Sequence, residues 1–188
     1  QWLRPLDICC RPADHNDGPL GADEALNSFK HLVNASANAQ TSVADLLDDP
    51  EVEAVYIATP NSLHAEWVIE CAKAGKHILC EKPLGISRAE AEDMFHAARA
   101  HEVWLMEAFM YRFHPRSLKL KQLLASGAIG EVRLVRASFA FTATNPNDVR
   151  LNAELVGGAL MDVGCYCVNF ARLAVGQVPN RALATARW

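Results

Sequence analysis

Three short apolar runs alternate with two segments of helical periodicity in the middle of the chain. The runs cover residues 54–60, 77–80 and 103–109, and charged or polar residues or proline stand where each one stops. Between them, apolar residues recur at the spacing of one helical face. The pattern predicts the order strand, helix, strand, helix, strand. Because the runs are continuously apolar, we expect strands that are buried on both faces.

Each of the two expected helices carries its own start or stop signals. Ser62 is a candidate N-cap of the first helix, and Gly75 is a candidate stop. Ser87 and Glu90 match a capping box at the start of the second. The expected buried stripes are Leu63, Trp67, Cys71 and Ala74 in the first helix and Ala91, Met94, Phe95 and Ala98 in the second.

Alternating strands and helices with short connections are typical of a parallel α/β sheet with right-handed crossovers. Ligands of such sheets bind at the carboxyl ends of the strands. This arrangement places Thr59–Asn61, Glu81–Pro83 and Glu107 at one edge of the sheet. The polar groups that end the apolar runs are therefore expected to meet there.

The pattern changes after residue 113. Pro115 and Gly127 bracket a predicted helix. Residues 131–141 then alternate apolar and polar side chains, which is typical of a strand with one buried face in an antiparallel sheet. A glycine pair leads into a predicted helix over residues 160–175, and residues 181–188 begin another alternating strand. We expect an α+β unit with an open antiparallel sheet that this chain begins and does not finish.

Residues 1–40 show no clear strand or helix period. Gly18 and Gly21 stand apart with Pro19 between them, so the segment lacks a G-x-G-x-x-G turn. The chain also begins at Gln1, which suggests a fragment or a processed product. We therefore expect an incomplete or atypical N-terminal part.

Charge and composition exclude several classes of protein. The 188 residues carry a formal net charge of −4, which argues against a nucleic-acid partner. No apolar run approaches the roughly 18 residues of a membrane-spanning helix, and no secretory signal is visible. The six cysteines include no C-x-x-C pair, so we expect no metal site and instead reduced thiols in a cytoplasmic protein.

Lys82 is the first candidate for chemistry. It follows a predicted buried strand. Pro83 disfavours the helical conformation for the Lys82 backbone, so we expect an extended chain that directs the ammonium toward the edge of the sheet. A partly buried lysine can take part in proton transfer. The alternative interpretation is that Glu81 and Lys82 form an ordinary surface pair at a strand end.

Asp162 and Tyr166 form the second candidate, because residues four apart share a helix face. A tyrosine hydroxyl beside a lysine is a suitable acid/base pair for the oxidation of an alcohol. The alternative is a helix cap at Asp162 and a half-buried structural tyrosine.

Arg112 at the end of the third strand can hold a substrate hydroxyl or phosphate, whereas His114 is a candidate structural residue at a helix entry.

Several stretches together resemble one known family. They are "VYIATPNSLH", "AGKHILCEKPLG", "EAFMYRFHP", "IGEVRLVRASF" and "GGALMDVGCYCVN". They resemble the Gfo/Idh/MocA oxidoreductases, and the D-x-x-x-Y spacing resembles the branch that holds glucose–fructose oxidoreductase and dimeric dihydrodiol dehydrogenase. The resemblance implies a Rossmann-type dinucleotide-binding domain over residues 1–112 and the start of a truncated substrate and dimerisation domain over residues 113–188.

The resemblance also implies roles for individual residues. Lys82, Tyr166 and Asp162 would be catalytic, with Tyr166 as the acid/base and Asp162 orienting substrate hydroxyls. The Lys82–Pro83 peptide would be cis. The implied cofactor-binding residues are Thr59, Pro60, Asn61, His64, Glu81, Lys82 and Arg112.

An NAD(P)-dependent enzyme follows from this resemblance, with NADP favoured. It would transfer a hydride between the cofactor and a CH–OH group of a sugar, a polyol or a trans-dihydrodiol. The full-length parent would form a homo-oligomer, without nucleic-acid or membrane partners. Because the glycine-rich turn is missing, we expect weak dinucleotide binding by these 188 residues alone. A non-catalytic regulatory protein that binds dinucleotide or sugar, and a non-functional remnant, are the alternatives.

Overall fold

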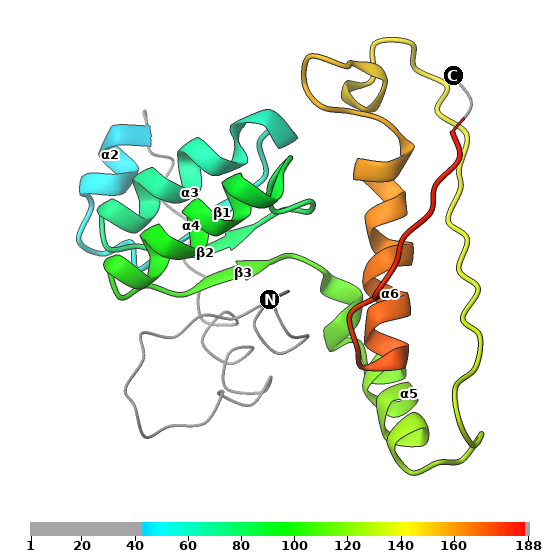
Figure 1. Ribbon diagram of the computed structural model, residues 1–188. Coiled ribbons are helices and arrows are strands. Elements are labelled where there is room, and N and C mark those ends of the chain that lie inside the picture. The colour runs from blue at the N-terminus through cyan, green and yellow to red at the C-terminus, as the bar shows by residue number, and fades with distance from the viewer. Residues whose placement is uncertain (1–42, 187–188) are drawn as a thin grey trace.

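The computed structural model describes residues 43–186, and the predictions for residues 1–40 lie outside this part. Figure 1 shows a small α/β unit joined, through the chain that follows strand β3, to a second unit built on two long helices. The elements are α2 (Val43–Asp48), β1 (Ala54–Ile57), α3 (His64–Lys73), β2 (His77–Cys80), α4 (Arg88–Ala100), β3 (Leu105–Glu107), α5 (Pro115–Ala125) and α6 (Cys165–Val175).

The three strands form a parallel sheet in the order β1-β2-β3, as the apolar runs predicted. Ile57 pairs with Cys80, and Cys80 pairs with Glu107, so the carboxyl ends of the three strands lie level with one another. Successive right-handed crossovers in one direction place both connecting helices on one face of the sheet. Helices α3 and α4 accordingly pack against each other. The sheet therefore presents its polar strand ends along one edge.

Only part of the predicted burial is correct. The second stripe is confirmed, since Met94, Phe95 and Ala98 are buried and Ala91 packs against them. The first stripe is only partly correct: Cys71 is buried and Trp67 packs against the core, but Leu63 and Ala74 are exposed. The other buried residues of α3 are His64, Val68 and Ala72. A short 3₁₀ turn over Asn61–Leu63 precedes the helix and contains Ser62, and this turn changes the face that meets the sheet.

Strand β1 also differs from the expectation of a strand buried on both faces. The side chain of Tyr56 is exposed, and within β1 only Ile57 is buried. Strands β2 and β3 meet the expectation better, because Ile78 and Leu105 have no exposed surface. The core of the α/β unit thus lies between β2, β3 and the two crossover helices.

Leu105→Ala is expected to lower the free energy of unfolding by about 3 kcal/mol, since it deletes a fully buried side chain from a packed core. Leu183→Ala makes the same chemical change at a position that is 92% exposed, so it should shift stability by less than about 0.5 kcal/mol. Urea unfolding followed by circular dichroism measures both. Equal effects of the two substitutions would contradict the described core.

The antiparallel sheet predicted for the second unit is not formed by the described residues. Residues 132–141 and 181–186 run without strand pairing in the structure. Leu134, Phe139 and Phe141 of the first segment are exposed. A strand is stabilised by the side-chain pairs and hydrogen bonds that it makes with a neighbouring strand. Residues 43–186 supply no such neighbour for these two segments, so their alternating sequence does not form a sheet there.

The helices of the second unit agree with the sequence. Helix α5 begins at Pro115, and His114 caps it by accepting a hydrogen bond from the Arg116 N–H at 3.1 Å. The predicted helix over residues 160–175 is confirmed, with a wider π-helical first part over Leu160–Gly164. Within residues 43–186, no helix combines the length and the hydropathy that crossing a bilayer requires.

Candidate active site

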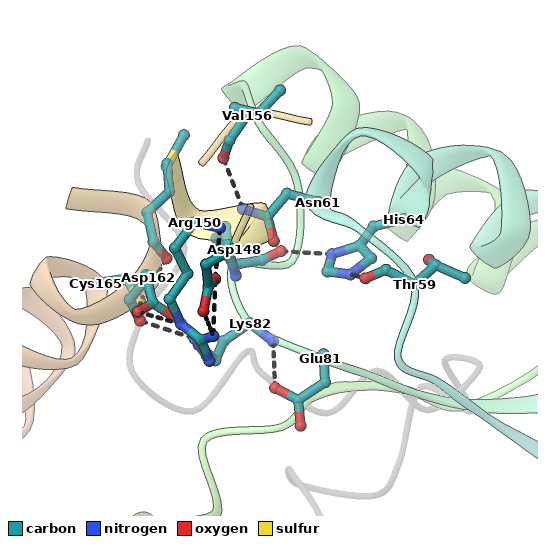
Figure 2. Close-up of polar contacts among 12 residues, drawn as sticks. Thr59, Asn61, His64, Glu81, Lys82, Asp148, Arg150, Val156, Asp162 and Cys165 are labelled. Atoms are coloured by element: carbon teal, nitrogen blue, oxygen red, sulfur yellow. Dashed lines mark hydrogen bonds and ion pairs between the residues drawn. The ribbon is translucent and has the colours of Figure 1, made fainter. Parts of the chain in front are cut away.

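Lys82 joins the two units of the fold. Its Nζ lies 2.9 Å from Asp162 Oδ1 and 2.8 Å from the Asp162 carbonyl oxygen. The side chains are 15% and 13% exposed, so this ion pair is largely removed from water. Figure 2 shows Lys82, Asp162 and Arg150 converging at the strand edge. The Lys82 Nζ also lies 5.3 Å from the centre of the Tyr166 ring, within the range of a cation–π contact.

The turn that carries Lys82 is held from both sides. The Lys82–Pro83 peptide is cis, as the family resemblance implied. The Pro83 carbonyl lies 2.8 Å from Nδ1 of His64 in α3. The Leu84 N–H donates to Glu107 Oε1, at the end of β3, over 2.8 Å. These contacts, made to α3 and to the end of β3 by the two residues that follow Lys82, restrict the direction in which its side chain leaves the sheet.

Glu107 is a largely buried carboxyl group within this support. Burial raises its pKa above the ordinary value of 4.5, while the hydrogen bond from Leu84 and the positive charges of Arg112 and Arg172 act in the opposite direction. The folded state thus favours the protonated form of Glu107 more than the unfolded state does.

Glu107→Gln is expected to change the pH dependence of stability, because glutamine does not titrate and its amide oxygen can still accept from Leu84. The protonated carboxyl contributes its full stabilisation below pH about 4, and this contribution is lost as the pH rises through the raised pKa. The variant should therefore gain stability relative to the parent as the pH rises above about 4. Urea unfolding across this range measures the difference, and a difference that does not change with pH would contradict the raised pKa.

Glu81 has a partner that the sequence did not indicate. The Tyr56 hydroxyl donates to Glu81 Oε1 over 2.6 Å. Although most of the Tyr56 side chain is exposed, partial desolvation first, and then this hydrogen bond, raise the pKa of Tyr56 to about 12. The second carboxylate oxygen of Glu81 accepts from the Lys82 N–H at 3.2 Å. Tyr56 therefore positions the carboxylate that precedes the candidate catalytic lysine.

The remaining residues predicted at the end of β1 lie together, with different exposures. His64 is fully buried, and its Nε2 lies 3.0 Å from the Thr59 carbonyl oxygen, so it links the first two strand ends. The Asn61 side chain donates to the Val156 carbonyl at 2.8 Å, which ties this edge to the second unit. Pro60 precedes the 3₁₀ turn that leads to His64. Thr59 Oγ1 is buried and has no hydrogen-bond partner among residues 43–186.

Aromatic rings surround Tyr166. The ring centres of Phe109, Tyr111 and Phe139 lie 5.2, 6.0 and 5.5 Å from that of Tyr166. Burial is the main cause that raises the pKa of Tyr166, followed by the negative charge of Glu81. The phenol therefore needs a nearby cation to lose its proton near neutral pH, and Lys82 supplies one.

Arg112 lies beside helix α6. Its Nη1 donates to Asn169 Oδ1 at 3.1 Å, and the Tyr111 hydroxyl donates to the same oxygen at 2.6 Å. Burial lowers the pKa of Arg112 from its ordinary value. The structure thus brings Arg112 to the aromatic side of the site, near Glu107, through a contact with Asn169 that sequence reasoning missed.

Two further residues missed by the sequence analysis are Asp148 and Arg150. The Arg150 Nε lies 2.8 Å from Asp162 Oδ2, and Asp148 binds Arg150 in turn. They belong to residues 142–152, which carry neither helical nor strand periodicity. No local signal in this stretch indicates a contact with Asp162, which is twelve residues further along the chain than Arg150.

The combined arrangement suits proton transfer next to a nucleotide. A lysine ammonium adjoins a partly buried phenol at the carboxyl edge of a parallel sheet, where nucleotides bind in folds of this class. The buried Thr59 hydroxyl, which the described part of the chain leaves without a partner, is a polar group that a ligand at this edge can satisfy. The residues present therefore fit a dinucleotide cofactor.

Family models match the chain on both sides of this site. The model "Oxidoreductase family, NAD-binding Rossmann fold" matches residues 22–109, and the "GFO/IDH/MocA C-terminal domain" matches residues 117–188. The first match begins inside the segment 1–40 that lacks a clear pattern, so part of that segment belongs to the matched domain.

Individual relatives agree with these matches. D-xylose 1-dehydrogenase (NADP(+)) 2 of Haloferax volcanii is 46% identical over 148 residues, which are 78% of this chain and 45% of that protein. Trans-1,2-dihydrobenzene-1,2-diol dehydrogenase of Mus musculus is 41% identical over 151 residues, or 79% and 45% of the two chains. The chain thus spans less than half the length of these curated relatives.

A solved structure shows the same fold. KijD10, a 3-ketoreductase from Actinomadura kijaniata in complex with NADP and TDP-benzene, superposes with a TM-score of 0.70 and 38% identity. The similarity covers 82% of this chain and 46% of that one. Because family models of both domains match in order, and relatives of about 40% identity extend across the site, this chain belongs to the Gfo/Idh/MocA oxidoreductase family.

Proposed function

We propose that this chain carries the catalytic centre of an NAD(P)-dependent oxidoreductase that acts on a CH–OH group of a sugar, a polyol or a trans-dihydrodiol. The observation that carries the proposal is the position of Lys82. Its ammonium is bound by Asp162 and lies 5.3 Å from the Tyr166 ring, at the edge of the sheet where a dinucleotide fits. Relatives named for xylose and dihydrodiol oxidation support this substrate class.

The cofactor would lie along the ends of β1 and β2. The residues proposed to line it are Thr59, Pro60, Asn61 and Glu81. The buried His64 ring supports this edge by its contacts with the Thr59 and Pro83 carbonyl oxygens. Nicotinamide, when bound, accepts or supplies the hydride. NADP is favoured over NAD by the relatives named above, one of which carries NADP in its name and another of which binds NADP in its solved complex.

The residues of the chain would handle the proton of the substrate hydroxyl. Tyr166 accepts this proton during oxidation and returns it during reduction. Lys82 stabilises the deprotonated phenol with its positive charge, and Asp162 holds Lys82 in place. Both oxygens of the Asp162 carboxylate bind cations in this structure. We therefore propose that the main role of Asp162 is to position Lys82, and that orienting the substrate is secondary.

The two alternatives make different predictions. A regulatory protein that only binds dinucleotide or sugar has no use for an acid/base pair, and here Lys82 is held next to Tyr166 by a largely buried ion pair. A non-functional remnant that folds only in part would not unfold cooperatively. A cytoplasmic location and homo-oligomer formation by the full-length parent remain predictions.

Turnover tests the proposal. The natural protein that contains these residues is incubated with NADP⁺ or NAD⁺ and with D-xylose or a trans-dihydrodiol, and formation of the reduced nicotinamide is followed by absorbance. Cofactor binding is measured separately by fluorescence titration. We expect binding and turnover with at least one substrate class. Tight binding without turnover would favour the regulatory alternative, and a chain that neither binds nor unfolds cooperatively would favour the remnant.

A further inference from the structure

We propose that Arg150 is a positioning residue of this site: through the carboxylate of Asp162, it sets how much of the Lys82 charge acts on the Tyr166 hydroxyl. The inference rests on the proposed oxidoreductase function for its kinetic consequences. Its structural basis is a row of four alternating charges formed by Asp148, Arg150, Asp162 and Lys82. Tyr166 lies at the Lys82 end of this row.

The Asp162 carboxylate is shared between two cations. Its Oδ1 lies 2.9 Å from Lys82 Nζ, and its Oδ2 lies 2.8 Å from Arg150 Nε. Because its side chain is only 13% exposed, water does not compete strongly for either oxygen. The positive charge of Arg150 therefore offsets part of the negative potential that Asp162 exerts on Lys82 and on the groups beyond it.

Arg150 is itself fixed from the side away from Asp162. Its Nη1 lies 3.2 and 3.3 Å from the two oxygens of Asp148, and its guanidinium lies 5.6 Å from the centre of the Phe141 ring. Asp148 first, and then Asp162, raise the pKa of Arg150 above its ordinary value. The guanidinium is therefore charged and oriented, although its side chain is 45% exposed.

Hydrogen bonds also fix the backbone around Arg150. The Arg150 carbonyl accepts from the Gly158 N–H at 2.7 Å, and the Gly158 carbonyl accepts from the Asp162 N–H at 3.0 Å. A Cβ on Gly157 would lie 2.5 Å from the Arg150 carbonyl oxygen, so a larger residue there has no room. The Asn61 contact with Val156 ties the same loop to the sheet edge. Arg150 thus reaches Asp162 from a loop with a defined path.

The charge relation has a predictable sign. Removing Arg150 leaves the full negative charge of Asp162 to act on Lys82 and on the phenol beyond it, which disfavours loss of the phenol proton. The other ionisable groups around Tyr166 stay in place; they are Glu81, Glu107 and Cys165 and the hydroxyls of Tyr56 and Tyr111. The pKa of Tyr166 should therefore rise when the charge at position 150 is lost.

Tyrosine titration tests this without any need for turnover. The chain contains three tyrosines, so NMR of protein labelled at tyrosine Cζ can follow each phenol, with Tyr166→Phe identifying its signal. In Arg150→Met we expect the pKa of Tyr166 to rise by about half a unit, the size expected for a partly exposed ion pair. Arg150→Lys should shift it less, because the positive charge is kept. Arg88→Met, which removes one partner of the exposed pair with Glu92 on α4, should not shift it.

Kinetics supply the second readout. In the natural protein with NADP⁺, Arg150→Met should lower kcat on the acidic limb by about threefold, change KM by less than about twofold, and move this limb of the kcat profile to higher pH. If the methionine variant does not fold, Arg150→Gln provides a second neutral side chain. An unchanged pKa of Tyr166 in a folded neutral variant would overturn the inference, and so would equal shifts in Arg150→Met and Arg150→Lys. If the parent shows no turnover, the proposed function fails while the titration still decides the role of Arg150.

Discussion

Lys82→Met is expected to lower kcat/KM by about a thousandfold, the upper part of the range for loss of a group that assists proton transfer. Methionine keeps the length and the apolar stem of lysine while removing the ammonium. Two consequences follow from the structure. The Tyr166 phenol loses the cation beside its ring, and the largely buried Asp162 carboxylate keeps Arg150 and loses its more buried partner. Steady-state rates with NADP⁺ and the substrate measure the loss.

Two further variants test whether the loss of activity comes from the Lys82 ammonium itself and not from removing a positive charge anywhere on the protein. Lys73→Met removes an ammonium from an exposed pair with Glu70 on α3, and its rates should stay within about twofold of the parent. Lys82→Arg keeps the positive charge with a different shape, so it should retain more activity than Lys82→Met. If Lys82→Met retained parental rates while binding cofactor normally, Lys82 would have no part in proton transfer.

Tyr166→Phe is expected to lower kcat by about a thousandfold, because it removes the hydroxyl that exchanges the substrate proton. The ring contacts with Phe109, Tyr111 and Phe139 remain possible for phenylalanine, so the fold and cofactor binding should be retained. The raised pKa of Tyr166 also gives the pH profile of oxidation an acidic limb, since the phenol must lose its proton to act as a base. This limb should disappear in the variant.

Tyr111→Phe is the matched control for this substitution. Tyr111 also contacts the Tyr166 ring, but its hydroxyl donates to Asn169. We expect less than about a tenfold loss of kcat and a preserved acidic limb, together with a loss of stability of about 1 kcal/mol from the missing hydrogen bond. If both substitutions reduced kcat equally, the aromatic cluster as a whole, and not the Tyr166 hydroxyl, would be responsible.

Much of the α/β unit is encoded locally and can be predicted from short stretches of the sequence. The run over residues 77–80 ends at a charged pair, and the structure ends β2 at Cys80. The capping signal at Ser87 is confirmed by a 3.2 Å hydrogen bond from the Glu90 N–H to Ser87 Oγ, while the Glu90 carboxylate accepts from Ile86. Such features depend on residues within a turn or two of one another. Their spacing alone therefore contains the information.

The partners of the site residues depend on the path of the whole chain. Lys82 and Asp162 are eighty residues apart, and Arg150 comes from a stretch with no periodic pattern. His64 was expected to line the cofactor, and the structure instead buries it between two backbone carbonyl oxygens. Tyr56 meets Glu81 only because β1 and β2 pair in one particular register.

The polar strand ends and the chemical types of the candidate residues can thus be assigned from sequence, because they follow from hydrophobic period and residue identity. The charge row from Asp148 to Lys82, the burial of His64 and the unpaired state of residues 132–141 required the folded chain. The physical reason is the same in each case. A hydrogen bond, an ion pair or a strand pairing needs two groups, and only the tertiary fold determines which distant group becomes the second.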